Sequence, residues 1–147
     1  MKIRKCKKKD FKGYLKLKRE EEKDYSEIIR EKIPHISDKE CKKDFNEILS
    51  SKQSILLVAE QGDLLAGFLF GSLSKYKTGN LEIIFVSKNF RRKGIAIKLI
   101  NSLLKILRSK KCKKIRLEVN LKNKNAIRLY QKLGFKPFKF VMQKELD

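Results

Sequence analysis

Apolar residues recur along this chain at two different spacings. Residues 54–87 hold three apolar runs with little polar interruption, whereas residues 95–107 place apolar side chains three and four positions apart. Continuous apolar runs of this length are typical of buried strands, and the wider spacing is typical of a helix with one buried face. The pattern therefore predicts a mixed α/β domain.

The first fifty residues are more polar and predict one strand and two helices. Residues 1–6 read as a short edge strand, and the charged stretch of residues 10–30 reads as one exposed helix. Pro34 interrupts this stretch. Ser37 and Glu40 then form a capping-box pattern, which opens a second helix.

The three apolar runs predict consecutive strands. Residues 54–60 and 64–73 flank a Gln-Gly-Asp turn and read as a hairpin, and a second turn is expected over residues 77–80. Residues 81–87 are almost continuously apolar, as expected of a strand covered on both faces. We therefore place this third strand at the centre of the sheet.

The clearest helix begins at Gly94, because apolar residues continue on one face over four turns. A strand follows over residues 115–119, where apolar residues alternate with Arg116 and Glu118, so Glu118 is expected to face away from the aliphatic row. The apolar stripe of the helix comprises Ile95, Leu99, Leu103 and Leu107, widened by Ile100 and Leu104.

The end of the chain predicts a short helix and a closing pair of strands. Residues 126–133 form an amphipathic pattern that stops at Gly134, a residue suited to a left-handed helix cap. Residues 135–146 read as a final hairpin. Since no long linker, repeat or low-complexity insertion interrupts the order, we expect one domain over residues 1–147.

The composition adds an unusual charge. The chain has 147 residues, 38 of them Lys or Arg against 17 Asp or Glu, with a formal net charge of +21. Such a field attracts nucleic acid, ribosomes or anionic cofactors. Because the lysines are scattered over every predicted element, a general lysine bias of the source proteome explains the charge equally well.

Cysteine and histidine exclude several site classes. Cys6, Cys41 and Cys112 are far apart and show no zinc-ligand spacing, so we expect free, mostly packed thiols in a reducing compartment. His35 is the only histidine, and we expect no metal. No apolar stretch resembles a signal peptide or a membrane span, and the expected location is the cytoplasm.

The loop before the clearest helix has the composition of a phosphate site. Residues 89–96 read Asn-Phe-Arg-Arg-Lys-Gly-Ile-Ala. The start of a helix exposes unpaired N–H groups, and small residues let a ligand approach the backbone. A diphosphate would fit there, although the same residues also suit a tight strand-to-helix turn with solvated basic side chains.

Together with its neighbours, this loop resembles the GNAT acetyltransferase superfamily over about residues 54–146, and most closely its ribosomal-protein and N-terminal alanine acetyltransferase branch. The resemblance implies a single-domain, mostly antiparallel mixed sheet flanked by helices, with one splayed strand pair that holds CoA. The matching segments are the strand ending at Val86, the loop of residues 91–96, the Leu117-Glu118-Val119 strand, residues 123–130, and Leu133-Gly134-Phe135.

The resemblance also implies where acetyl-CoA binds. The thioester and pantetheine would lie along main-chain groups of the central strand, and the diphosphate on the backbone of the loop. Asn123 matches a cofactor-contacting asparagine, although an ordinary helix N-cap explains it as well. The implied cofactor-binding residues are Ile84, Phe85, Val86, Arg91, Arg92, Lys93, Gly94, Ile95, Ala96 and Asn123.

Three residues are catalytic candidates by the same resemblance. Tyr130 matches the tyrosine that protonates the departing CoA thiolate, and its ordinary pKa near 10 suits a general acid. Glu118 matches a general-base position, and Glu82 matches an acidic position of other branches. We prefer Glu118, while a core-packed tyrosine and solvated or lysine-paired glutamates remain the simpler interpretations.

The resulting hypothesis is an acyltransferase that moves the acetyl group of acetyl-CoA onto an amine by direct attack. A protein N-terminus or ribosomal protein is the favoured acceptor. The alternatives are a small amine of the polyamine or aminoglycoside type, for which a cationic chain would need a local acidic pocket, and a non-catalytic RNA- or ribosome-binding module. We expect a monomer or homodimer without a membrane partner.

Overall fold

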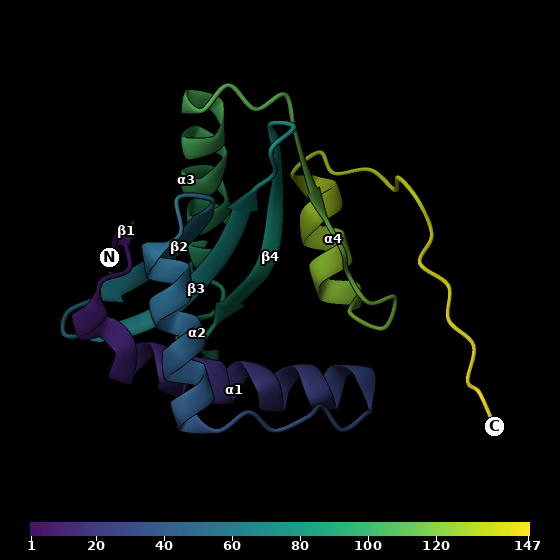
Figure 1. The fold of residues 1–147 in the computed structure, drawn as a ribbon, viewed down its shortest axis with the longest axis horizontal. Coiled ribbons are helices and arrows are strands. Elements are labelled where there is room, and N and C mark those ends of the chain that lie inside the picture. The colour runs from purple at the N-terminus through teal and green to yellow at the C-terminus, as the bar shows by residue number, and fades with distance from the viewer.

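The computed structural model describes all residues from Met1 to Asp147 and contains one sheet with four α-helices around it (Figure 1). Two short 3-10 turns, Lys8–Asp10 and Lys88–Phe90, lead into the first helix and out of the fourth strand. The elements in chain order are β1 (Lys2–Lys5), α1 (Phe11–Ile29), α2 (Asp38–Ser50), β2 (Ser54–Gln61), β3 (Leu64–Leu73), β4 (Thr78–Val86), α3 (Ile95–Ser109), β5 (Lys114–Leu117) and α4 (Lys124–Lys132).

The strands lie in chain order in a 5-stranded sheet, β1-β2-β3-β4-β5. The first three pairings are antiparallel, and β4 pairs with β5 in parallel because α3 carries the chain back across the sheet between them. The predicted mixed, mostly antiparallel sheet flanked by helices is confirmed. β1, with the sequence Lys-Ile-Arg-Lys, forms one edge of the sheet and β5 forms the other.

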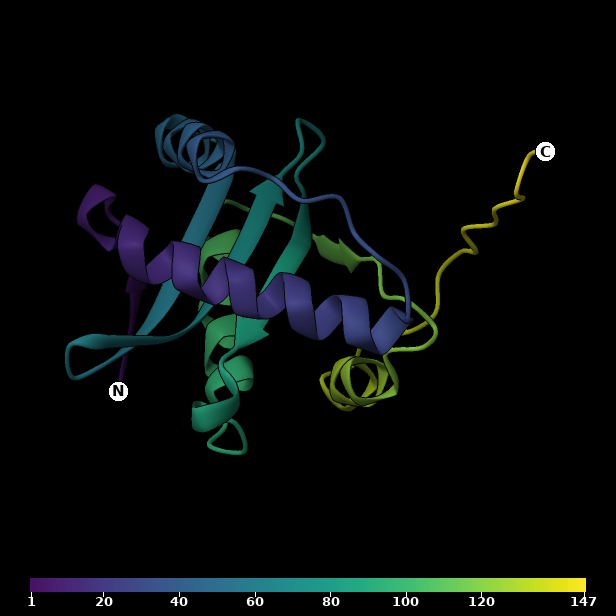
Figure 2. The same cartoon turned by 90° about the horizontal axis from the view of Figure 1, so that it is seen from below.

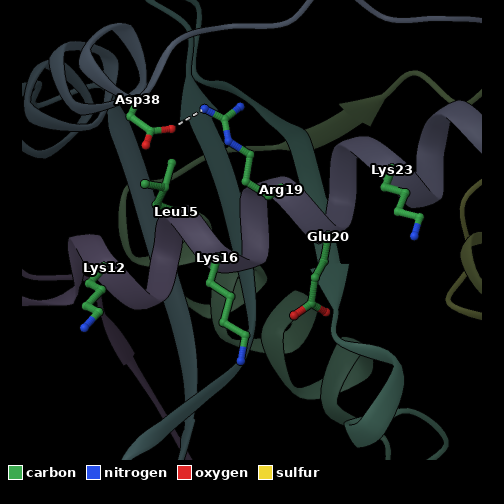
Figure 3. Close-up of a pocket in the computed structure, with 7 residues that line it drawn as sticks. All are labelled: Lys12, Leu15, Lys16, Arg19, Glu20, Lys23 and Asp38. Carbon is green, nitrogen blue, oxygen red and sulfur yellow. Dashed lines mark hydrogen bonds and ion pairs between the residues drawn. The ribbon is translucent and has the colours of Figure 1, made fainter.

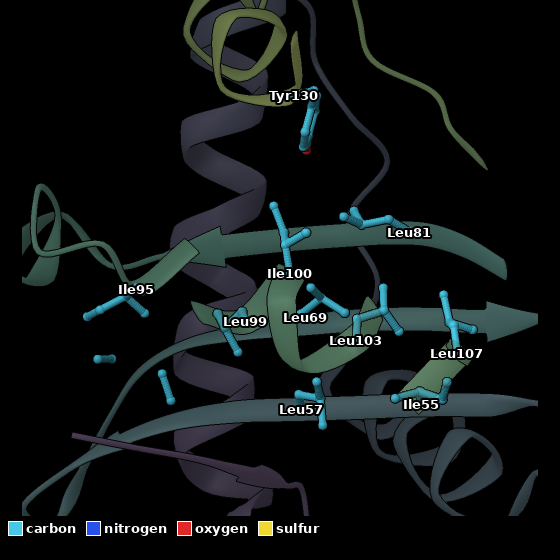
Figure 4. Close-up of a cluster of buried hydrophobic side chains, with 12 residues drawn as sticks. Ile55, Leu57, Leu69, Leu81, Ile95, Leu99, Ile100, Leu103, Leu107 and Tyr130 are labelled. Atoms are coloured by element: carbon cyan, nitrogen blue, oxygen red, sulfur yellow. The ribbon is translucent and has the colours of Figure 1, made fainter. Parts of the chain in front are cut away.

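Two apolar clusters hold the helices on opposite faces of the sheet. The first lies under α3 and α4 and includes the predicted stripe, of which Leu99 and Leu103 are fully buried (Figure 4). The second lies under α1 and α2 and centres on Phe45 and Phe68. Figure 2 shows α1 crossing the sheet, with its far end beyond β4. Burial of these side chains, at about 25 cal/mol per Å² of apolar surface, fixes both layers.

The helix predictions hold, with one refinement. α2 begins where the capping pattern placed it, and Ser37 Oγ accepts a hydrogen bond from the Glu40 N–H at 3.2 Å. α1 spans the charged stretch, but it is not simply exposed, because Tyr14 and Leu17 are buried against the sheet. Its apolar face is narrow and is easily missed among so many charged residues.

Two strand boundaries differ from the prediction by more than one residue. β4 begins at Thr78, inside the predicted turn of residues 77–80, because pairing with β3 and β5 extends it. β5 ends at Leu117, whereas residues 115–119 were predicted, because its pairing with β4 stops there. Both differences arise from tertiary pairing, which local sequence does not encode.

The predicted closing hairpin is wrong. Residues 136–147 form neither a helix nor a strand and are exposed throughout. Residues 138–146 contain no Gly, Pro, Asn or Asp, so they lack the residues that make a tight reversal. We call residues 138–147 the C-terminal tail; it runs away from the body of the molecule in both views (Figures 1 and 2).

Candidate active site

The site is built where β4 and β5 part. Their pairing runs from Thr78 opposite Lys114 to Leu81 opposite Leu117 and then stops, while β4 continues to Val86. Beyond Leu81, the edge of β4 that faces β5 has no strand neighbour. Its main-chain N–H and C=O groups, except the Val86 carbonyl that accepts a hydrogen bond from Arg91 Nε, are therefore available to a ligand that carries amides.

The side chains at the end of β4 are not turned into this opening. Ile84 and Val86 pack against the first cluster, and Phe85 is buried in the second. On the other side β4 pairs closely with β3, where a Cβ on Gly67 would lie 2.6 Å from the Phe85 carbonyl oxygen. Any role of these three β4 residues toward a ligand thus falls to their main chain.

Glu82 occupies a β-bulge beside the opening. Phe70 pairs with Ile83 and Gly71 pairs with Leu81, which leaves Glu82 as the extra residue on β4. Its carboxylate accepts a hydrogen bond from Ser72 Oγ at 2.6 Å, and the residue is exposed. Bulges of this kind redirect a side chain and recur next to active sites.

Glu118 follows directly after β5 and lies on the same side of the sheet as Glu82. Leu81 and Leu117 are in register and both pack toward α3, so the residues that follow them point toward the α1 and α2 face. Glu118 is exposed while Val119 packs against the first cluster, as the alternation predicted. The two carboxylates therefore flank the opening from neighbouring strands.

The loop before α3 is a concave array of N–H groups. Arg92 and Gly94 both have left-handed backbone conformations, with φ of 60° and 73°. Gly94 is the N-cap of α3, and it has no side chain to accept a hydrogen bond from the first turn. The first hydrogen bond of the helix is donated by the Lys98 N–H to the Gly94 carbonyl oxygen at 3.1 Å. The N–H groups of Ile95, Ala96 and Ile97 have no acceptor within the chain. This arrangement suits an anion such as a diphosphate.

Arg91 and Lys93 do not extend freely from this loop. Arg91 Nε donates to the Val86 carbonyl at 2.9 Å, and its guanidinium pairs with Asp24 of α1 at 3.1 Å. Lys93 Nζ lies 5.8 Å from the centre of the Phe90 ring. The Arg91 side chain therefore joins the loop to α1, and its main-chain N–H bonds to the Lys88 carbonyl at 3.4 Å, so the predicted phosphate contact falls to the residues that follow Arg91.

The sequence analysis did not predict that acidic residues of α1 bind the segment between β4 and α3. Asp24 pairs with Arg91, and Glu20 accepts a hydrogen bond from the buried Ser87 Oγ at 2.7 Å. Each pair is 67 positions apart in sequence. The only signal was the clustering of acidic residues in α1, a helix with as many acidic as basic residues in a strongly cationic chain, and this does not reveal their partners.

Asn123 has the structural role that was the alternative to cofactor contact. It is the N-cap of α4, and its Oδ1 accepts a hydrogen bond from the Ala126 N–H at 3.3 Å. The preceding residue, Lys122, donates through Nζ to the Ile29 carbonyl at 2.8 Å. The β5–α4 loop is thereby tied to the end of α1.

Tyr130 lies on α4 and faces the sheet. Its side chain is buried in the first cluster and packs edge-on against Phe135, with ring centres 5.8 Å apart. Figure 4 shows the hydroxyl end pointing toward β4, the strand that carries Leu81. Burial raises the pKa of Tyr130 above its ordinary value of 10.0, so the phenol keeps its proton at neutral pH.

A groove of about 500 Å³ lies on the opposite side of the sheet, between α1, α2 and the strands. Phe70 and Ile83, which flank the Glu82 bulge, form part of its floor. Its acidic residues outnumber its basic ones, in contrast to the molecule as a whole. They are Glu22, Asp44 and Glu47, against Lys18 alone.

A second, shallower depression follows the outer surface of α1 (Figure 3). It brings together none of the residues predicted for the site, and Arg19 within it is paired with Asp38 of α2 at 2.7 Å. Its lining is Lys12, Leu15, Lys16, Arg19, Glu20, Lys23 and Asp38. We treat it as part of the general cationic surface.

Comparison with known proteins identifies the family. The model of the acetyltransferase (GNAT) family matches residues 16–135, which is most of the chain. The chain belongs to the GNAT acetyltransferase family. This GNAT chain also resembles curated proteins over shorter stretches, and it spans about half the length, or less, of those that it matches.

One such relative is the probable spermine N(1)-acetyltransferase of Bacillus subtilis subsp. natto (strain BEST195). It is 34% identical over 82 residues, which cover 51% of the GNAT chain and 54% of the relative. Another is the N-alpha-acetyltransferase MAK3 of Arabidopsis thaliana, 35% identical over 57 residues, covering 39% and 30% of the two chains.

Solved structures share the GNAT fold along the whole chain. AAC(6')-Iy in complex with the bisubstrate analogue CoA-S-monomethyl-acetylneamine has a TM-score of 0.80 at 21% identity, covering 99% of this chain and 97% of that chain. A transcriptional regulator from Bacillus halodurans C-125 gives 0.81 at 21% identity and 99% coverage of both chains. Among the helices of the GNAT chain, none is both long and apolar enough to cross a membrane.

Proposed function

We propose that this chain is an N-acetyltransferase that transfers the acetyl group of acetyl-CoA to an amine by direct attack. The observation that carries the proposal is the opening between β4 and β5. A loop with unpaired N–H groups, a free strand edge, a buried tyrosine and two carboxylates lie on the elements that border it. Family membership supports the same reaction.

The donor would lie along the free edge of β4. Its diphosphate would accept hydrogen bonds from the N–H groups at Gly94, Ile95 and Ala96, and its pantetheine amides would pair with the main chain of residues 84–86. Acetyl-CoA supplies the activated acyl carbon. CoA complexes of AAC(6')-Iy on the same fold support this choice.

The protein's own chemistry is proton transfer on the two sides of the opening. Tyr130 would donate its phenolic proton to the departing sulfur. Glu118, our preferred base, would accept the proton of the attacking amine, directly or through water. Glu82 is the second candidate, because the bulge and the Ser72 hydrogen bond hold it beside the groove.

For the acceptor we propose a small polycationic amine in the groove between α1 and α2. The comparisons favour this alternative over the protein N-terminus that the sequence suggested, because a spermine acetyltransferase and aminoglycoside acetyltransferases are among the similar proteins. The three acidic residues of the groove supply the local negative field that a polyamine needs on a chain of net charge +21.

A protein N-terminus remains the second candidate acceptor. It is supported by the similarity to the Arabidopsis thaliana N-alpha-acetyltransferase, which is limited to 57 residues. A comparison of spermidine, an aminoglycoside and a short peptide as acceptors separates the two classes. Turnover of the peptide alone would overturn the polyamine assignment and leave acetyl transfer intact.

The donor site can be tested by calorimetry of acetyl-CoA binding. In the Gly94→Glu variant, the added carboxylate should repel the diphosphate and abolish measurable binding. Gly62→Glu is the matched control, because Gly62 has the same left-handed backbone (φ of 61°) and open surroundings but lies in the β2–β3 turn. If wild type ignores acetyl-CoA and binds RNA with a steep salt dependence, the non-catalytic alternative holds instead.

The acceptor site can be tested at Asp44. The Asp44→Asn variant should raise the KM for spermidine about fivefold, because a nearby carboxylate contributes about 1 kcal/mol to a cation at a solvated site. Asp63→Asn removes the same charge from the β2–β3 turn and should leave KM unchanged. Equal KM values in all three proteins would place the acceptor elsewhere.

A further inference from the structure

The charges of the chain are not evenly mixed in the folded molecule. Every ion pair lies within residues 4–38 or joins this segment to residue 60, 88 or 91. Residues 64–117 contain a single acidic residue, Glu82, and apart from Lys88 and Arg91 their basic residues form no ion pair. Folding therefore leaves one part of the surface with positive charge that no carboxylate neutralises.

Two neighbouring loops carry much of this unneutralised charge. The β3–β4 turn of residues 74–77 and the α3–β5 loop of residues 110–113 lie side by side, because Thr78 pairs with Lys114 where β4 and β5 begin (Figure 1). Six exposed lysines gather there, and we call them the lysine pole: Lys75, Lys77, Lys110, Lys111, Lys113 and Lys114.

Tyr76 stands among these lysines in the β3–β4 turn. Its side chain is 78% exposed, and Lys75 Nζ lies 5.0 Å from the centre of its ring. The turn is held in place by Ser74 Oγ, which accepts hydrogen bonds from the N–H groups of Tyr76 and Thr78 at 3.3 and 3.2 Å. An exposed ring between ammonium groups can stack on an unpaired base while the lysines contact its phosphates.

Structural roles explain only part of the lysine pole. Lys110 and Lys111 follow the C-terminal end of α3, where positive charge is favoured by the helix dipole. Lys75 and Lys77 are not at a helix end, and no side chain of the pole forms a hydrogen bond or ion pair within the chain. A general lysine bias raises the number of lysines, but it does not remove carboxylates from residues 83–117.

Nucleic acid fits this surface better than a membrane does. Peripheral membrane binding needs several apolar side chains that enter the lipid, and Tyr76 is the only large apolar side chain exposed on the two loops. A single strand fits better than a duplex, because only unpaired bases can stack on a protruding ring.

We propose that the lysine pole binds single-stranded nucleic acid, with phosphates on the lysines and an unpaired base on the Tyr76 ring. The donor loop lies at the other end of α3. With 15 residues at 1.5 Å each, this helix separates the two places by about 22 Å. An acetyl-CoA molecule and a nucleic-acid strand can therefore be bound at the same time.

The test is fluorescence anisotropy with labelled uridine and thymidine oligomers of about ten nucleotides. The logarithm of the association constant should fall with the logarithm of salt concentration with a slope of roughly −3.5, as expected for about five phosphate contacts. Tyr76→Ala should weaken binding at least about fivefold, the loss of one stacked base. The tighter of the two oligomers identifies the strand as RNA or DNA. Unaltered affinity in Tyr76→Ala would overturn the proposal.

Lys77→Gly and Lys111→Gly test the charges without endangering the fold. Both lysines have left-handed backbone conformations, with φ of 58° and 62°, which glycine adopts more easily. Thermal stability should therefore be equal or higher, while each variant should lose about fivefold in affinity at about 0.1 M salt, the contribution of one phosphate contact.

Arg30→Gly is the matched control. Arg30 is exposed and has the same left-handed conformation, with φ of 58°, but it caps α1 beside the β5–α4 loop. This variant should bind the oligomers as the wild type does. Equal losses in all three glycine variants would overturn the proposal, because binding would then follow the total charge of the protein.

Competition supplies the second measurement. Saturating acetyl-CoA should leave oligomer affinity unchanged, and displacement of the oligomer would overturn the proposal by placing it on the loop before α3. Binding to vesicles of phosphatidylcholine and phosphatidylserine, without binding to either oligomer, would overturn it in favour of a membrane surface. None of these readouts requires acetyl transfer, so a failure of the proposed enzymatic function would be seen separately.

Discussion

Tyr130 combines burial with a hydroxyl directed toward β4. Its ring lies in the first apolar cluster, and its hydroxyl end points toward β4, the strand from which β5 departs after Leu81. Burial is also what raises its pKa, so the phenol carries its proton at neutral pH, which is the form a general acid needs. The orientation of the hydroxyl is compatible with our proposed chemical role, whereas the raised pKa would be shared by a purely packing tyrosine.

We expect Tyr130→Phe to lower kcat for acetyl transfer about 10²-fold, the usual contribution of a positioned general acid. The apolar ring is retained, so packing and acetyl-CoA affinity should be unchanged. Steady-state kinetics combined with calorimetry would measure both. An unaltered kcat would assign the leaving-group proton to another donor. The sequence alone could not separate the two roles, because a core tyrosine and a proton donor both occupy an apolar helical face.

The two glutamates require a direct comparison. If Glu118 is the base, Glu118→Gln should lower kcat and remove the acidic limb of the pH–rate profile, whereas Glu82→Gln should leave that limb in place. The opposite result would assign the base to the bulge. Each variant serves as the other's control, because both residues are exposed and lie on the same side of the sheet.

Asp10 makes a residue-scale contribution to stability that depends on pH. Arg4 donates hydrogen bonds of 2.7 and 2.8 Å to its carboxylate, and these, with the Lys7 N–H, lower its pKa below the ordinary 3.8. A lowered folded-state pKa stabilises the protein above the unfolded value, and this stabilisation is lost as pH falls through the folded-state pKa.

Asp10→Asn should therefore reduce the free energy of unfolding by roughly 2 kcal/mol at pH 7, and by less as the pH approaches 3. Urea unfolding at several pH values would measure this. Asp63→Asn, at an exposed turn, is the control and should change little. Parallel curves for wild type and Asp10→Asn would show that the Arg4 pair is not the cause.

At the scale of elements, sequence predicted what local pattern encodes. The long apolar runs of β2 and β3 and the stripe of α3 were placed almost to the residue. What escaped prediction depends on pairing. Compared with the prediction, β4 begins three residues earlier because it pairs with β3 and β5, and β5 ends two residues earlier because β4 diverges from it. The predicted hairpin of the tail does not form.

The close contact of β3 and β4 gives an element-scale prediction. Gly67→Ala would place a Cβ 2.6 Å from the Phe85 oxygen, a main-chain atom that cannot rotate away. We expect a loss of about 2 kcal/mol in the free energy of unfolding, typical of an overpacked core. Weaker acetyl-CoA binding should accompany it, because the donor edge of β4 moves.

Gly13→Ala is the matched control in α1. Its Cβ would lie 3.0 Å from Leu65 Cδ1, the end of a flexible side chain. Alanine also favours a helix over glycine by about 1 kcal/mol. The variant should be neutral or slightly more stable in denaturant unfolding, and equal losses at positions 13 and 67 would contradict our account of the strand contact.

The net charge of the whole molecule affects the binding of every charged ligand. The formal charge of +21 should favour an anionic donor, and salt should weaken that attraction. We expect the Kd of acetyl-CoA to rise about tenfold between about 0.05 and about 0.5 M salt. Acetyl-dephospho-CoA has one phosphate fewer, so its Kd should depend less steeply on salt concentration. Equal salt dependence for the two donors would mean that the net charge of the protein does not contribute to donor binding.

The edge strand β1 is one of the two unpaired edges of the sheet. Unpaired edges can pair with a strand of another molecule, and chains that do so at both edges can form filaments. Lys2 and Lys5 are exposed on β1, and Arg4 is engaged with Asp10 and Glu60. An incoming strand there would meet one exposed ammonium group on each face of β1, and such charges on an edge strand disfavour growth of the sheet into filaments.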